Sequence, residues 1–173
     1  MLSNVYLFSW EEKYLLDKEI TRRKENFKEK FWTGAIFSFN SENFDIWQIK
    51  QALYAGWLFV SKKLILITWL PTDSDTTNKI SAEITEKFTD EFISTEGQVP
   101  ADSLLVFISY KPDKRWRLYK FLEKNATAKS FDKLSGIELK NFVKNELNWL
   151  NIDQDTIDYL VVKVGNNLYN IVS

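Results

Sequence analysis

The sequence predicts an α/β protein built around a parallel β-sheet. Short apolar runs recur along residues 1–134, and stretches with apolar residues at helical spacing separate them. The runs at 64–70 and 104–108 are apolar on both alternating faces, which is typical of central strands covered on each side. Regular alternation of strand and helix indicates a parallel sheet with crossover connections.

The first two strands are predicted at 5–8 and 35–39. Ser9 offers an N-cap for a helix that we expect to extend to about Lys30. Turn-forming residues then lead into a second helix at 44–55. This helix carries two apolar stripes, so both of its sides are expected to contact something. One stripe is Ile46, Ile49 and Leu53, and the other is Trp47, Tyr54 and Leu58.

The rest of the chain is organised around residues 53–70. Gly56 is expected to end the second helix, because glycine tolerates the left-handed backbone conformation found just past helix ends. Three large apolar residues, Trp57, Leu58 and Phe59, follow this break. The run 64–70 is then predicted as the third strand, in the centre of the sheet.

A polar loop at 72–78 and a helix ending at Gly97 are predicted to lead to a fourth strand at 104–108. Asp113 is expected to cap the next helix, at 114–125, and a short edge strand is expected within 127–134. The predicted inward stripe of the helix that ends at Gly97 is Ile80, Ile84, Phe88 and Phe92.

The strand–helix alternation stops after Leu134. Ser135 and Glu138 have the spacing of a capping box and predict a helix to about Asn151. Asp153 or Asp155 is expected to cap a last helix. Two helices bury little surface by themselves, so we expect the chain to be the front part of a longer protein.

The composition excludes several classes of function. The 173 residues include no cysteine and no histidine, which excludes disulfides, thiolate zinc sites and a Ser-His-Asp triad. The formal net charge is −1, so no overall basic field favours DNA or an anionic membrane. No signal peptide or transmembrane run is evident, and a cytoplasmic location is expected.

The turn after the first strand is where a phosphate-binding loop would lie. Such a loop needs glycines, so that backbone amides can close on the phosphates. Residues 8–13 contain no glycine, and they include Glu11 and Glu12, which would repel a triphosphate. We therefore expect no ATP site and no other cofactor.

Two groups of charged residues suggest alternative sites. Glu11, Glu12, Asp73 and Asp75 follow two different strands, and they would converge on Mg²⁺ if those strands were neighbours, as in receiver-like or phosphatase-like domains. The favoured interpretation is that Glu11 and Glu12 interact favourably with the positive end of a helix dipole, and that Asp73 and Asp75 are ordinary polar residues of a loop. Lys62, Lys63, Arg115 and Arg117 would form a basic patch if they lay close together. The favoured interpretation is that they are solvated residues at helix and strand ends.

The apolar triplet Trp57-Leu58-Phe59 leaves two interpretations open. It is either a corner of the core or an apolar plug for the pocket of a partner.

The order of these segments resembles the delta subunit family of the bacterial DNA polymerase III clamp loader. The matching stretches are 5–23, 35–67, 103–122 and 135–150, which together span most of the chain. In that family the first strand, a turn without a phosphate-binding loop, and a helix occur in the same order.

The resemblance implies a RecA/AAA+-like five-stranded domain at 1–134, a helical lid at 135–173, and a C-terminal collar that this sequence lacks. It implies a non-catalytic subunit with no cofactor that binds the sliding clamp (beta) and joins gamma/tau and delta prime, with DNA contacted only in the assembled complex. The implied clamp-binding residues are Leu58 and Phe59, with Trp57 where the family often has a small residue.

Overall fold

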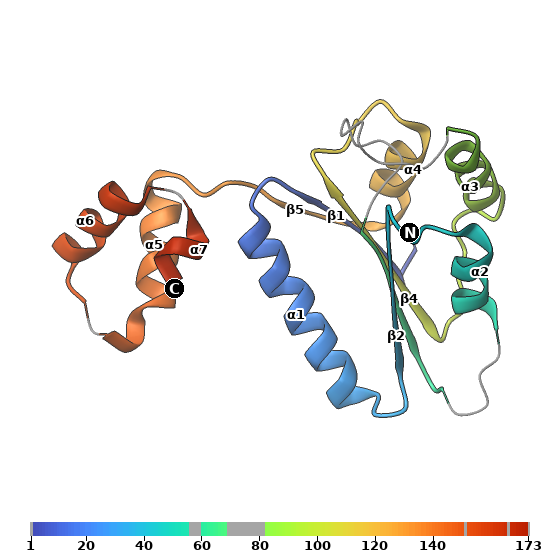
Figure 1. Ribbon diagram of the computed structural model, residues 1–173, viewed down its shortest axis with the longest axis horizontal. Helices are drawn as coiled ribbons and strands as arrows, with labels where there is room; N and C mark the ends of the chain where they lie inside the picture. Colours follow the sequence, from blue (N-terminus) through green and yellow to red (C-terminus); the bar gives the residue numbers. More distant parts are fainter. Residues whose placement is uncertain (1, 56–59, 69–81, 151, 166, 173) are drawn as a thin grey trace.

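The computed structural model describes residues 2–55, 60–68, 82–150, 152–165 and 167–172 (Figure 1). The strands are β1 (Val5–Trp10), β2 (Ala35–Asn40), β3 (Lys63–Thr68), β4 (Ser103–Tyr110) and β5 (Thr127–Phe131). The helices between them are α1 (Lys13–Lys30), α2 (Ile46–Tyr54), α3 (Ala82–Ser94) and α4 (Arg117–Asn125). The carboxyl-terminal part contains α5 (Gly136–Glu146), a 3₁₀ turn (Asn148–Leu150), α6 (Gln154–Val164) and α7 (Leu168–Val172).

All five strands are parallel, in the order β2-β3-β4-β1-β5. This arrangement confirms the predicted RecA/AAA+-like α/β fold. The run predicted at 104–108 forms the middle of β4, the central strand. The predicted edge strand is β5, which pairs with β1 from Tyr6 opposite Thr127 to Trp10 opposite Phe131.

The two faces of the sheet carry separate hydrophobic cores, and α1 lies on the face opposite to α2, α3 and α4 (Figure 1). Along β4, Leu105 and Phe107 point into the core under α2 to α4, whereas Val106 and Ile108 point towards α1. This alternation explains the uninterrupted apolar run, because a strand covered on both sides has no face for polar residues.

A third hydrophobic cluster joins the carboxyl-terminal helices. Its buried members are Leu139, Val143, Leu147, Ile157, Leu168 and Ile171. Tyr14 on α1 packs against this cluster, and its ring meets Phe142 edge-on with centroids 5.7 Å apart. The short helix α7 was not predicted, although Leu168, Ile171 and Val172 have helical spacing. The division of the chain into domains at residue 134 stays a prediction.

Three predicted helix caps differ from the structure. Ser9 belongs to β1, which continues to Trp10, and Glu12 caps α1 by accepting a hydrogen bond from the Tyr14 amide at 3.1 Å. Helix α4 begins at Arg117, three residues later than predicted, because Asp113 instead binds the amide and guanidinium of Arg115. Ser135 precedes α5, but its side chain makes no capping hydrogen bond.

Helix α3 buries a different stripe from the predicted one. Phe88 and Phe92 are buried as expected, but Ile84 is exposed, and Thr85 and Thr89 are buried in its place. Steps of four residues advance by 40° around a helix, so a stripe drawn only with such steps drifts off the buried face. Ile80 lies outside the described residues.

Within the described ranges, no helix has the length and apolar character needed to cross a bilayer.

Helix α1 carries a buried carboxylate, Glu19, among cations. Arg22 and Arg23 donate to it at 2.9 and 2.8 Å, and the Lys129 ammonium on β5 lies 3.7 Å away. The Arg23 guanidinium also stacks over the Tyr6 ring at 4.5 Å. Burial alone raises the pKa of Glu19, but the hydrogen bonds from the two arginines outweigh it and hold the pKa below its ordinary value.

Replacing Glu19 with glutamine is expected to lower the free energy of unfolding by about 2 kcal/mol at pH 7, because charge-assisted hydrogen bonds are lost. A depressed pKa stabilises the fold above the unfolded-state pKa, and this contribution disappears as pH falls through the folded-state value. The difference between wild type and Glu19→Gln should therefore shrink below about pH 4.5, as urea unfolding at several pH values will show. Glu25→Gln, on an exposed position of α1, is the control.

Candidate functional site

The residues predicted to bind a partner, Trp57, Leu58 and Phe59, lie outside the described residues. The structure does describe what surrounds them in sequence, which is the end of α2 and the stretch that leads into β3.

Helix α2 presents one apolar side to the core and another to solvent. Asp45 caps the helix by accepting from the Gln48 amide at 2.9 Å, so α2 begins at Ile46, two residues later than predicted. Ile49 and Leu53 are buried. Trp47 and Tyr54, from the second predicted stripe, are 64% and 53% exposed. They are seven residues apart, or two turns and roughly 10 Å along the helix, and so share one side.

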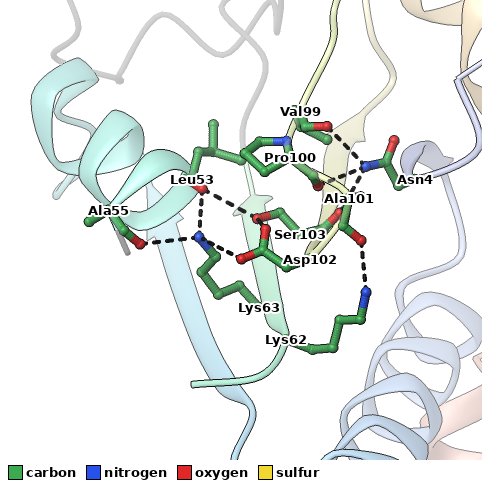
Figure 2. A network of polar contacts seen from close by, with 10 residues as sticks. All are labelled: Asn4, Leu53, Ala55, Lys62, Lys63, Val99, Pro100, Ala101, Asp102 and Ser103. Carbon is green, nitrogen blue, oxygen red and sulfur yellow. Dashed lines mark hydrogen bonds and ion pairs between the residues drawn. The ribbon is translucent and has the colours of Figure 1, made fainter. Parts of the chain in front are cut away.

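The end of α2 is fixed to the sheet by a buried lysine (Figure 2). Lys63 is only 3% exposed, and its ammonium donates to the Leu53 carbonyl at 2.7 Å and to the Ala55 carbonyl at 3.4 Å. Asp102 forms an ion pair with it at 3.4 Å. The sequence-based interpretation of Lys63 as a solvated strand end is therefore wrong, because carbonyls at the end of α2 and the Asp102 carboxylate surround its ammonium.

Another exposed aromatic residue lies in the loop beside the amino ends of β2 and β3. Trp32, between α1 and β2, is 92% exposed. Its neighbour Thr33 donates to the Ser61 hydroxyl at 2.9 Å, and the Ala35 amide donates to the Lys62 carbonyl at 3.0 Å. The loop that contains Trp32 is thus bonded to the chain just after residues 57–59. Sequence reasoning missed Trp32, although a tryptophan between the charged end of a helix and a Thr-Gly turn was a signal for exposure.

A groove of about 380 Å³ runs between α2 and α3. Leu53 and Tyr54 line it from α2, and Phe88 and Phe92 line it from α3. The Lys50 ammonium and the Glu91 carboxylate, 2.7 Å apart, form an ion pair between the two helices. The groove therefore combines an apolar floor with a charged margin beside Tyr54.

The strand order argues against the alternative of a magnesium site. Strand β4 lies between β1 and β3, so the acids that follow these two strands are not on neighbours. Glu11 lies 3.7 Å from the Lys111 ammonium, and Glu12 is occupied as a helix cap. Among the residues that the structure describes, no three acidic side chains gather closely enough to hold a metal ion. Asp73 and Asp75 lie outside the described residues.

The turn after β1 is closed to phosphate by its own backbone. The amides of Glu11 and Glu12 both donate to the Phe131 carbonyl at 2.9 Å, and the Glu12 carboxylate occupies the start of α1. A phosphate-binding loop needs these amides free and the helix start open to an anion. Here the Glu11 and Glu12 amides instead hold the end of β5 to the turn.

The alternative of a basic patch is not supported by the structure. Lys62 and Lys63 lie at the amino end of β3, whereas Arg115 and Arg117 follow the carboxyl end of β4, roughly 25 Å away along eight strand residues. Arg117 pairs with Asp90 at 2.9 Å. Hydrogen bonds from Arg115 lower the pKa of Asp113 to about 2.

The strand order and the blocked first turn define a RecA/AAA+-like α/β protein. Trp32 and Tyr54 are exposed in the segments next to the amino end of β3. The sequence matches the family model "DNA polymerase III, delta subunit" over residues 6–132. The chain therefore belongs to the DNA polymerase III delta subunit family.

A solved structure agrees with this family in its fold. The Bacillus subtilis DNA clamp loader delta protein (YqeN) is 21% identical, with a TM-score of 0.66 over 99% of this chain and 51% of that chain. The chain thus spans about half the length of that protein. A search of curated proteins finds no match.

Proposed function

We propose that this chain acts in DNA replication as a clamp-loader delta subunit, which binds the sliding clamp (beta) and helps to open it. Leu58 and Phe59 are the proposed anchor, with Trp57 beside them. Membership of the delta family supports this role. The observation that carries it is the exposure of Trp47 and Tyr54 on the helix that leads directly into the anchor.

The energetics require a surface larger than the anchor. Burial of one leucine and one phenylalanine stabilises a complex by roughly 3–6 kcal/mol before the costs of association. A micromolar complex needs about 8 kcal/mol net. The exposed aromatic residues Trp32 and Tyr54 offer additional apolar area, because more than half of the surface of each remains open to solvent.

The proposed role needs no chemistry in this chain. The amides of Glu11 and Glu12 are bonded to Phe131, which supports a non-catalytic subunit without ATP. ATP then acts in the partner subunits gamma/tau, with delta prime completing the loader. Clamp opening follows if the chain binds the open clamp more tightly than the closed one, because differential affinity alone shifts the population. We further propose a cytoplasmic location and a domain boundary at residue 134.

The test is equilibrium binding of the 173-residue chain to the sliding clamp of the same organism. Leu58→Ala/Phe59→Ala is expected to weaken binding at least about a hundredfold, since each decade corresponds to about 1.4 kcal/mol.

The matched control is Tyr159→Ala/Val162→Ala, which removes an aromatic and an aliphatic side chain from exposed positions on α6. This control should bind like the wild type. Equal affinity of Leu58→Ala/Phe59→Ala and wild type would remove the anchor from the proposal.

A further inference from the structure

The buried ammonium of Lys63 lies at the carboxyl-terminal end of α2 (Figure 2). The last carbonyls of a helix have no partner within the helix and carry its partial negative charge. Leu53 and Ala55 provide two such carbonyls, and Lys63 donates to both. A buried cation is costly unless it is hydrogen-bonded and paired, and these carbonyls together with Asp102 meet that need.

A second set of contacts holds this lysine in place. Lys63 and Ser103 are opposite each other in the register of β3 and β4, and the Lys63 amide donates to the Asp102 carbonyl at 2.8 Å. The Ser103 hydroxyl lies 3.4 Å from the Leu53 carbonyl and 3.1 Å from the Asp102 carboxylate, so it can donate to either. The Asn4 side-chain amide donates to the Ser103 carbonyl at 3.0 Å and to the Pro100 carbonyl, in the loop before β4, at 3.1 Å. The end of α2 is thereby fastened to the two central strands by side chains.

We infer that Lys63 is a positioning residue for clamp binding: it fixes the end of α2 at Leu53 and Ala55, the last described stretch before the proposed anchor. This inference rests on the proposed function. A segment that follows a fixed helix end has less conformational freedom to lose on association, and this difference appears as affinity. Lys62, the preceding residue, provides the contrast, because it is partly exposed and its ammonium donates to the Ala101 carbonyl at 2.8 Å rather than to the end of α2.

The experiment compares Lys63→Met with Lys62→Met, which make the same chemical change at adjacent positions. Amide hydrogen exchange is measured at Ala55, whose amide donates to Gln51 within α2, and at Leu105 in β4. Clamp affinity is measured under conditions in which each variant is fully folded. In Lys63→Met, exchange at Ala55 should rise at least about tenfold relative to Leu105, and clamp binding should weaken about tenfold. Lys62→Met should match the wild type in both.

If Lys63 had only a structural role, Lys63→Met would unfold at a lower urea concentration, but the folded variant would bind the clamp with wild-type affinity. Folded Lys63→Met with wild-type affinity therefore overturns the inference. If Lys63→Met does not fold, Ser103→Ala decides, since it removes one hydroxyl contact to Leu53; a smaller loss of affinity is expected, and none would overturn the inference. Failure of the wild type to bind the clamp overturns the proposed function and the positioning role together. Loss of binding in Leu58→Ala/Phe59→Ala with unchanged Lys63→Met overturns only the positioning role.

Discussion

Replacement of Phe107 with alanine is expected to lower the free energy of unfolding by about 3–5 kcal/mol. Phe107 is fully buried in the central strand β4. Its ring meets Phe92 edge-on at 5.3 Å and Phe88 at 6.2 Å, so it joins the sheet to α3. Alanine would leave a cavity under α3, which is one wall of the groove beside Tyr54. Urea unfolding followed by circular dichroism measures the loss.

The control for Phe107→Ala is Tyr110→Ala, at the exposed end of the same strand. Tyr110→Ala removes the contact with the Trp10 ring, whose centroid lies 4.5 Å away, and the contact with the Lys111 ammonium, 5.6 Å from the Tyr110 centroid. A cost of about 1 kcal/mol is expected. Similar losses for the two variants would contradict the packing of α3 on β4, because the phenylalanine would then behave as a surface residue.

The sheet was predictable because its central strands are buried on both faces. The apolar run 104–108 became the middle of β4 for that reason. The neighbours of each strand were not predictable, because the apolar pattern within a strand does not indicate which strand lies beside it. The magnesium alternative depended on that unknown, and the position of β4 between β1 and β3 decides against it.

Helix starts were the weakest part of the sequence prediction because tertiary pairing competes with local caps. Ser9 has the side chain of a good N-cap, but its backbone pairs with Ser109 on one side and Ser130 on the other. The pairing extends β1 and moves the start of α1 to a cap at Glu12. Asp153 had no such competitor and caps α6, accepting from the Thr156 amide at 2.8 Å.

The supports of the candidate site were only partly predictable. The two stripes of α2 followed from helical spacing, and the exposure of Trp47 and Tyr54 leaves the second stripe open to a partner. The burial of Lys63 did not follow from its sequence, because a lysine beside another lysine at a strand start is usually solvated. Its acceptors come from the end of α2 and the start of β4, which only the folded chain brings together.

Replacement of Val143 with aspartate is expected to unfold the carboxyl-terminal helices while the sheet stays folded. Val143 is fully buried on α5 among Leu139, Ile157 and Leu168. An uncompensated carboxylate there costs about 3–5 kcal/mol, more than a cluster of three short helices can offset. Hydrogen exchange should show free exchange over 136–172 and continued protection in β1, β3 and β4.

Val162→Asp makes the same change on α6 at an 82% exposed position, and its effect should stay within about 0.5 kcal/mol. The comparison tests the proposed boundary at residue 134, because separate domains lose structure separately. The ring of Tyr14 on α1 packs against Phe142 and Tyr169 in the helical part, and these contacts favour joint unfolding of the two parts. If Val143→Asp also removes protection from the strands, these contacts couple the two parts into one cooperative unit, and the proposed boundary is wrong.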